Sequence, residues 1–329
     1  MSDLLAGMGR PSRRGAPPPD IVDLVRVEDR ISFLYFEHCK INRSDNAITV
    51  RDDSGATYVP AASVSVLMLG PGAAITHGAM VLLGVCGATV IWVGENGVRM
   101  YAFGKPLTHS SVMLQTQARL VSNRRTRLAV ARQMYAKRFP GEDVSRLTMA
   151  QLRGREGVRV RRIYRQWSDR TGVDWDRRTY NPTNFDDSTE INKALSAAHV
   201  CLYALAHAAI VSVGCSPGLG FVHTGHEKSF VYDVADLYKA ELSIPVAFKT
   251  AADGPEDIGA ETRRRMRDAV CDLKLLQRMV SDIKGLFLSA ASPAEKAALA
   301  PEVNHLGLWD EKSGEVSAGR SYGVGEAGD

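Results

Sequence analysis

The segment HSSVMLQTQARLVSNRRTRLAVARQMYAKRF, residues 109–139, is the place where the sequence changes from a strand pattern to a helix pattern. Its apolar residues recur every three or four positions, which is the period of an amphipathic helix. We therefore expect one long helical segment here. The same period predicts further helices at roughly residues 147–171, 188–213, 229–251 and 257–287. An all-α domain over residues 105–289 follows from this pattern.

The preceding residues, 20–104, contain short runs rich in β-branched side chains, which favour strands. The run NAITVRDDSGATYVP predicts a hairpin that turns at Asp-Ser-Gly. ATVIWVGENGVRMYAFG predicts another, because Asn96 and Gly97 can adopt the positive φ angles of a tight turn. Between the hairpins, Thr76 is a candidate N-cap for a short helix. The sequence thus predicts an α+β protein, with a mainly β domain before the helical one.

The chain has 329 residues, of which 45% are hydrophobic, enough for one large or two ordinary domains. Residues 1–19 are rich in Pro, Arg and Gly, and we expect a disordered leader there. The Ala-, Gly- and Glu-rich residues 290–329 predict a flexible tail. The net charge of +4 hides clustering, because 41 basic residues nearly balance 37 acidic ones.

The five cysteines contain no CxxC spacing, which argues against a zinc site and against a disulfide framework. They are interpreted as small core residues in a reducing cytosol. The N-terminal residues lack the pattern of a signal peptide, and we expect no apolar stretch of about 18 residues that could span a membrane. A cytoplasmic protein without a membrane partner is predicted.

The stretch GFVHTGHEKSFVYDVADLYKAEL, residues 220–242, concentrates titratable groups in a short window. Ser229 is a candidate N-cap, so that a helix would begin at Phe230. At about 100° per residue, Asp233 and Asp236 then share one face of this helix. The alternative is a solvated first turn with ordinary acidic residues, which the helix dipole tolerates.

His223 precedes this helix on a glycine-flanked loop. An imidazole together with carboxylate oxygens suits Mn²⁺ and tolerates Mg²⁺. The alternative is a hydrogen-bonded loop histidine without a ligand.

Glu156 lies on the apolar stripe of its predicted helix, among Leu152, Val160, Ile163 and Trp167. A lone carboxylate in such a position is unfavourable unless it is paired or binds a metal. A buried Glu–Arg pair and a metal ligand are therefore both open interpretations.

Arginine runs accompany these acidic groups, notably ETRRRMRDAV and VSNRRTRLAVARQ. A single run of this kind usually forms a solvated face, but several runs beside acidic residues and a histidine indicate a divalent-metal site that faces a polyanion. Phosphodiester chemistry is the natural assignment, because a cation neutralises charge on the phosphate in the transition state.

The residues also resemble a known family, the universal integrase endonuclease of CRISPR adaptation, in the form found in type I-E systems. The resemblance runs from about Asp20 to Leu288. It rests on the motifs LRGREGVRVRRIY, GFVHTG followed by SFVYDVADLYK, TEINKALSAAHVCLYALAHAAI, and VGENGVRMYAFG.

The resemblance implies a β-sandwich-like N-terminal domain that forms a homodimer and a helical catalytic domain. It implies Glu156, His223 and Asp236 as ligands of Mg²⁺ or Mn²⁺, with Asp233 as an additional catalytic carboxylate. The family joins the 3′-OH ends of a short prespacer DNA to the CRISPR repeat, so the DNA hydroxyl is the nucleophile. Pairs of dimers are bridged in the family by a small ferredoxin-like CRISPR-associated partner, which is therefore expected here.

The same resemblance suggests which residues bind DNA: Arg99, Lys239, Arg263, Arg264, Arg267 and His38. His38 stands where relatives can have a tyrosine, so its stacking on a duplex end is an open question. Arg99 could instead be a strand residue that points to solvent. Two other functions compete with integration: a metal-dependent DNA-repair nuclease, and a non-catalytic DNA-binding scaffold whose acidic residues only form ion pairs.

Overall fold

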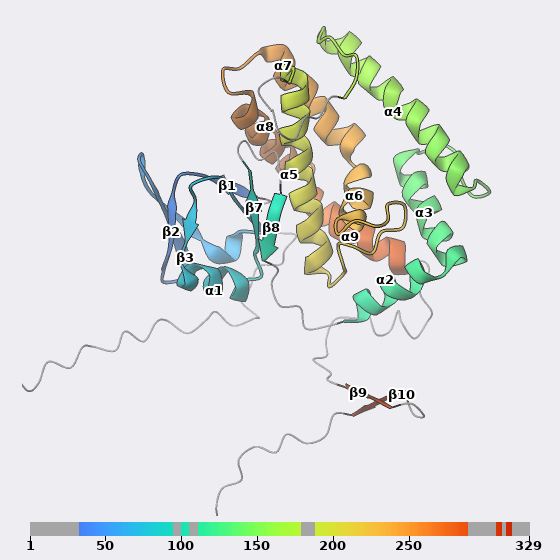
Figure 1. Cartoon of the computed structure of the whole chain (residues 1–329), viewed down its shortest axis with the longest axis horizontal. Coiled ribbons are helices and arrows are strands. Elements are labelled where there is room, and N and C mark those ends of the chain that lie inside the picture. Colours follow the sequence, from blue (N-terminus) through green and yellow to red (C-terminus); the bar gives the residue numbers. More distant parts are fainter. Residues whose placement is uncertain are drawn as a thin grey trace, which may run out of the picture.

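The computed structural model describes residues 33–94, 100–104, 111–178 and 188–288, and the backbone of two paired strands, β9 (Gly307–Asp310) and β10 (Gly314–Ser317). A strand-rich region is followed along the chain by a helical region, as predicted (Figure 1). The expected leader, and the expected tail apart from these two strands, lie outside the described residues. The domain limits stay predictions.

The strand-rich region contains two four-stranded sheets. The order in the first sheet is β1 (Leu34–Phe36), β5 (Val66–Leu69), β7 (Thr89–Val93), β8 (Met100–Gly104). The order in the second is β4 (Gly55–Pro60), β3 (Ala47–Asp52), β2 (Lys40–Ser44), β6 (Ala74–Ile75). Both expected hairpin pairings are confirmed, since β3 pairs antiparallel with β4 and β7 with β8. The proposed turn at Asn96 and Gly97 lies outside the described residues.

The central strands β5 and β7 of the first sheet are buried on both faces because their side chains alternate between two hydrophobic cores. Leu67 and Leu69 of β5 pack with Ile41 and Ile48 of the second sheet. This core also receives the short helix α1 (His77–Val85). The intervening Met68 belongs to the other core, which includes most of the helical region. The sheet is therefore joined to the helices by continuous apolar packing.

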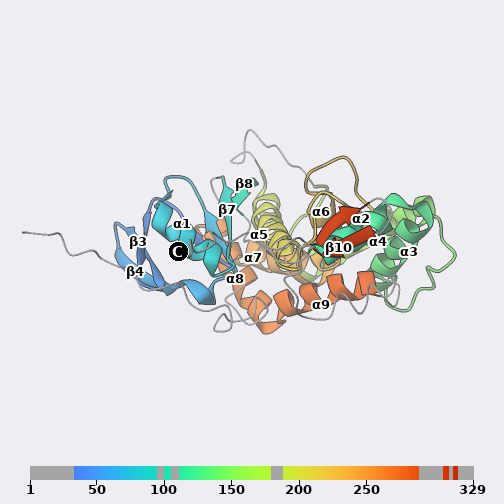
Figure 2. The same ribbon diagram turned by 90° about the horizontal axis from the view of Figure 1, so that it is seen from below.

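The helical region consists of α2 (Val112–Ser122), α3 (Arg124–Arg138), α4 (Met149–Thr171), α5 (Glu190–Ser212), α6 (Ser229–Asp236), α7 (Ile244–Asp253), α8 (Ile258–Asp272) and α9 (Leu275–Leu288). Helix α5 packs against α6, α7, α8 and α9. It lies between the sheets and α4 in both views (Figures 1 and 2). The acidic helix α6 is thus held against the most buried helix of the region.

Helix α5 corrects the expectation that no apolar stretch is long enough to span a membrane. Its mean hydropathy over an 18-residue window is 1.7, but 94% of that window is buried inside the protein. Its alanine, leucine and valine side chains form the centre of the helical core. The apolar composition of α5 is therefore explained by burial among other helices.

Three segments that we expected as single helices are divided in the structure. The first breaks at Asn123, whose side chain accepts hydrogen bonds from the backbone of Arg125 and Thr126 and so caps α3. The second breaks after α6, at Leu237 and Tyr238, and a π-helical turn (Lys239–Ser243) then leads directly into α7. The third breaks at Lys274, which has a positive φ of 46° between α8 and α9.

Candidate active site

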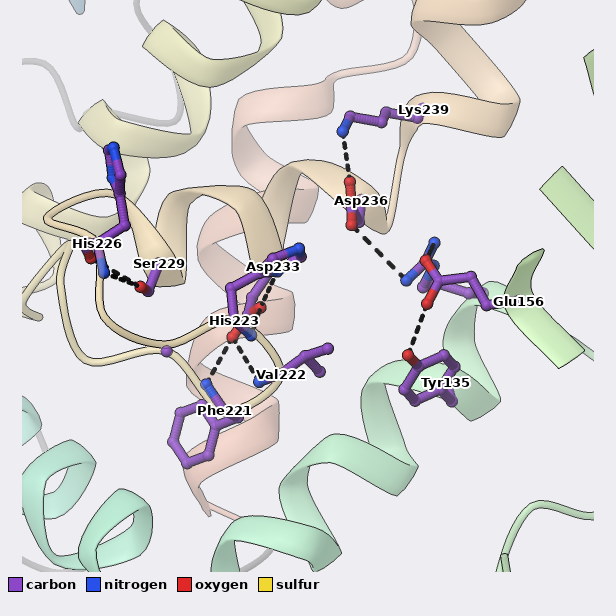
Figure 3. Close-up of polar contacts among 12 residues, drawn as sticks. Tyr135, Glu156, Phe221, Val222, His223, His226, Ser229, Asp233, Asp236 and Lys239 are labelled. Atoms are coloured by element: carbon purple, nitrogen blue, oxygen red, sulfur yellow. Dashed lines mark hydrogen bonds and ion pairs between the residues drawn. The ribbon is translucent and has the colours of Figure 1, made fainter. Parts of the chain in front are cut away.

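Asp233 organises the loop that precedes α6. Its side chain is buried, and Oδ2 accepts hydrogen bonds from the backbone N–H of Phe221 (2.6 Å) and Val222 (3.0 Å). Oδ1 accepts from the backbone N–H of His223 (2.9 Å) and lies 2.7 Å from Nδ1 of the same residue (Figure 3). Both oxygens of this carboxylate are therefore engaged within the protein.

His223 is oriented by this contact. An ionised carboxylate only accepts hydrogen bonds, so Nδ1 carries a proton and Nε2 is the nitrogen that can meet a ligand. The hydrogen bond that His223 donates to Asp233 raises the pKa of His223, against the opposing effect of burial. The side chain remains 44% exposed. The two interpretations of His223 are thus compatible, because a hydrogen-bonded loop histidine still offers one free edge.

The same loop is fixed from outside by residues that we did not single out for this role. Arg127 donates from Nε to the carbonyl oxygen of Phe221 (2.9 Å) and from Nη2 to that of Gly220 (3.0 Å). Gln117 donates to the carbonyl oxygens of Ser216 (2.9 Å) and Leu219 (3.0 Å). These partners are more than 90 residues apart in the chain, so no local sequence signal could have identified them.

The start of α6 differs from the expected one. The helix begins at Ser229, with Lys228 in the N-cap position and no side-chain cap. The Ser229 hydroxyl instead donates to the carbonyl oxygen of His226 (2.7 Å), closing the loop on itself. The alternative of a solvated acidic turn is also wrong, because the side chains of Asp233 and Asp236 are only 0% and 11% exposed.

Glu156 and Asp236 approach one another across the guanidinium of Arg138. The Arg138 Nη2 atom contacts Oε1 of Glu156, and Nη1 lies 3.8 Å from Oδ2 of Asp236. The Tyr135 hydroxyl donates to the other oxygen of Glu156 (2.6 Å), and Lys239 Nζ lies 2.6 Å from Oδ1 of Asp236 (Figure 3). The predicted Glu–Arg pair is thus real, but its arginine comes from α3 and was not singled out.

The pKa shifts describe charged groups that stabilise one another. Burial acts to raise the pKa of Asp236, but Lys239 and Arg138 outweigh it and hold this pKa below its usual range. Burial acts to lower the pKa of Lys239, but Asp236 and Tyr203 outweigh it and raise this pKa. Asp236 is therefore ionised and Lys239 protonated at neutral pH.

A cavity of about 810 Å³ opens beside these groups. Glu156, Asp236 and Lys239 lie in its wall. Apolar side chains such as Ile163 and Leu237 form part of the wall, and cationic and aromatic residues also line it: Arg138, Arg178, Lys228, Tyr164, Tyr203 and Tyr232. Positive charge draws phosphate groups, and tyrosine rings offer faces on which bases can stack. The cavity thus has the chemistry of a nucleic-acid site.

The predicted ligands are gathered in this region, but without metal-ligand spacing. Among the described residues, no group of three or more His, Cys, Asp and Glu side chains is arranged to hold a metal ion. The two carboxylates contact the cations of Arg138 and Lys239 instead. Two carboxylates and one imidazole are nevertheless the donors that Mn²⁺ and Mg²⁺ accept. The donor chemistry therefore fits such an ion.

Of the predicted DNA-binding arginines, Arg263 is placed differently from the others. It is only 7% exposed, and its guanidinium lies over the ring of Tyr35 at 4.4 Å. A DNA contact by this buried side chain stays a prediction. Arg264 is more exposed and pairs with Glu261 at 2.6 Å, and Arg267 lies 3.6 Å from an aspartate on the same helix. DNA contacts by Arg264 and Arg267 stay predictions.

The remaining predicted DNA contacts lie in different places. Lys239 is part of the acidic site itself. His38 is exposed after β1 with a positive φ of 46°, and it does not line the cavity. Arg99 lies outside the described residues.

Fold and site together define a class. A helical region that places buried carboxylates, an oriented histidine and several cations beside one cavity has the groups used by phosphodiester-processing nucleases. The structure is similar to a crystal structure of a TtCas1–DNA complex, with a TM-score of 0.59 and 46% identity over 79% of this chain and 97% of that one.

The family model of CRISPR associated protein Cas1 matches residues 33–141 and 142–254. A CRISPR-associated endonuclease Cas1 of Clostridium sp. (strain SY8519) is 50% identical over 299 residues, 90% of this chain and 97% of the relative. Another, from Thermus thermophilus, is 43% identical over 311 residues, 94% of this chain and 95% of the relative. The chain belongs to the Cas1 family, which confirms the family predicted from the sequence.

Two more distant structures share the fold alone. A casposase bound to an integration product has a TM-score of 0.63 at 13% identity, covering 78% of this chain and 91% of that chain. A Cas6-RT-Cas1–Cas2 complex has a TM-score of 0.59 at 16% identity, covering 78% of this chain and 34% of that chain.

Proposed function

We propose that this protein is the DNA integrase and endonuclease of CRISPR adaptation, in the form of type I-E systems. The observation that carries the proposal is the convergence of Glu156 and Asp236 on one guanidinium in a cation-rich cavity, beside the carboxylate-oriented His223. Family membership supports the same activity, because the relatives are named CRISPR-associated endonucleases.

In this proposal, Glu156, Asp236 and Nε2 of His223 hold Mg²⁺ or Mn²⁺. The bound cation would polarise the scissile phosphate and stabilise the charge of the transition state. Asp233 acts differently from the second catalytic carboxylate first expected. Because both its oxygens are engaged by the loop, it positions His223 instead of contacting substrate.

The reaction exchanges one phosphodiester bond for another. The 3′-OH oxygen of the incoming DNA attacks a phosphorus of the repeat, and the bond to the repeat's 3′ oxygen breaks. The attacking hydroxyl loses a proton and the departing oxygen gains one, so no nucleotide cofactor is required. Lys239 and the other cations of the cavity hold the backbone phosphates.

The proposed partners follow from the relatives. One similar structure is a Cas1–DNA complex, and a more distant one is a Cas1–Cas2 complex. We therefore propose prespacer and repeat DNA as substrates, and a bridging Cas2 dimer between homodimers of this chain. We propose that residues 20–104 form a β-sandwich-like domain that makes the homodimer, and that residues 105–289 form the catalytic domain. The complex would act in the cytoplasm.

A plasmid integration assay tests this function. Short duplexes with 3′-OH ends are incubated with supercoiled plasmid, with and without the small partner, and duplexes with 3′-deoxy ends are the control. If the protein is an integrase, duplexes with 3′-OH ends become covalently joined to the plasmid, and duplexes with 3′-deoxy ends do not. Shortened or nicked DNA without joining would favour a repair nuclease. Unchanged rates in Asp236→Ala would instead identify a non-catalytic scaffold.

Metal binding is tested separately by calorimetry. The wild-type protein should bind Mn²⁺, and a Glu156→Ala, His223→Ala double variant should bind it far more weakly. Identical binding isotherms would show that these residues do not hold the cation.

A further inference from the structure

Arg138 links the two carboxylates of the acidic site through different nitrogens of one guanidinium. Nη2 contacts Glu156 of α4, and Nη1 lies 3.8 Å from Asp236 of α6. The side chain of Arg138 is only 11% exposed, and those of Glu156 and Asp236 are 19% and 11% exposed. The bridge is therefore largely shielded from water. Charge pairs in such a buried position attract more strongly than pairs on the surface.

The planar shape of the arginine head is essential to this geometry. Its fork presents several N–H donors in fixed directions, so one side chain can serve two acceptors on different helices. A lysine carries the same charge as a compact ammonium group and lacks this fork. Lys239, by comparison, pairs with Asp236 at 2.6 Å and has no ion pair with Glu156.

We propose that Arg138 is a positioning residue that occupies the acidic pair while the site is free of metal, and that it must release both carboxylates before a divalent cation binds. The inference rests on the proposed function, which makes Glu156 and Asp236 metal ligands. Without a positive group between them, two buried carboxylates repel each other. The guanidinium supplies that positive charge until a divalent cation replaces it.

The surroundings of Arg138 suit such an exchange. Its guanidinium lies 5.4 Å from the ring centre of Tyr135 and 5.6 Å from that of Phe139, so aromatic faces remain beside it after release. Its side chain also lines the cavity. The Tyr135 hydroxyl holds the second oxygen of Glu156 independently of Arg138. Glu156 therefore keeps one anchor when the guanidinium leaves.

The test is calorimetric titration of Mn²⁺ into the full chain, with four variants. Arg138→Gln removes the charge and the bridge, whereas Arg138→Lys keeps the charge and removes the fork. Arg178→Gln is the matched control, because Arg178 lines the same cavity but donates to Asn192 and Ser196. A Glu156→Ala, His223→Ala double variant reports whether the metal site itself is correct.

If Arg138 competes with the metal, Arg138→Gln binds Mn²⁺ about tenfold more tightly than wild type. A tenfold change in affinity corresponds to the free energy of about one hydrogen bond to a charged group. Arg138→Lys should also bind more tightly, and Arg178→Gln only slightly more. Equal affinity of Arg138→Lys and wild type would overturn the inference, because only charge would then matter. Equal Mn²⁺ affinity of the wild type and the double variant would instead refute the metal site and, with it, the proposed function.

A second measurement uses protein without metal. In the presence of a chelator, Arg138→Gln should melt at a lower temperature than wild type, and Mn²⁺ should raise its melting temperature by more than that of wild type. An unchanged metal-free melting temperature would contradict the bridging role. If neither Arg138 variant folds, NMR of the wild-type side chain decides: its guanidinium signal must shift when Mg²⁺ is added, and a constant signal would refute release.

Discussion

The contact set of Asp233 makes a substitution there unusually informative. Its carboxylate accepts hydrogen bonds from three backbone N–H groups and contacts Nδ1 of His223. Asp233→Asn has nearly the same shape, but replaces one acceptor oxygen by an NH₂ group. If the amide nitrogen replaces Oδ2, the N–H groups of Phe221 and Val222 lose their acceptor. If it replaces Oδ1, the backbone N–H of His223 loses its acceptor, and Nδ1 keeps its contact only by giving up its proton. At least one of the four contacts is therefore lost.

The magnitude follows from the lost contacts. A hydrogen bond to a charged group contributes about 1.5–3 kcal/mol, so losing one lowers the free energy of unfolding by at least about 1.5 kcal/mol, and losing two lowers it by more. That is a large part of the roughly 5–15 kcal/mol that stabilises a typical domain. The loop should also lose its fixed geometry, since Asp233 contacts three successive residues of it.

Urea unfolding, followed by circular dichroism, measures this loss. Asp268→Asn is the control, because its carboxylate is 52% exposed and contacts only arginines of its own helix, so its change should stay within about 0.5 kcal/mol. If Asp233→Asn also loses less than about 1 kcal/mol, the buried carboxylate does not hold the loop as we argue.

The other predictions concern backbone, thiols and DNA. Gly220→Ala would place a methyl group 2.5 Å from a backbone oxygen and should lower the free energy of unfolding by about 1–3 kcal/mol. Gly218→Ala is the control, because its methyl group would have its nearest neighbouring atom at 3.6 Å. Equal urea midpoints of the two variants would contradict this prediction. Burial raises the pKa of Cys201 and Cys215 to about 12, so a thiol reagent should modify the exposed Cys271 first in native protein, and mass spectrometry showing the buried thiols labelled first would refute it. DNA affinity should fall steeply with salt if arginines bind phosphates, and a flat binding curve would argue against those contacts.

Local patterns identified much of the candidate site. The glycine-flanked His223, the acidic residues three apart on one helix, and Glu156 on an apolar stripe were all visible in the sequence. The helix breaks at Asn123 and Lys274 were missed, because a capping side chain and one residue of positive φ interrupt a period that continues on both sides. The period of apolar residues alone does not reveal a helix break that depends on a single residue.

The roles within the site could not be assigned from the sequence. The helix pattern placed Asp233 and Asp236 on one face, and only the resemblance gave them different roles; in the structure one is held by loop backbone and the other faces the cavity. Arg127 belonged to an arginine run and Arg138 was not singled out, yet one anchors the histidine loop and the other bridges two carboxylates.

The order of strands and helices follows from the amino-acid pattern alone, because the spacing of apolar residues decides which elements can bury one face. This pattern also placed the titratable residues on particular turns and loops. Which of these groups meet depends on how the helices pack, since the partners of Glu156 and of the histidine loop come from helices far along the chain. Packing around α5 sets those distances, and no local pattern specifies them.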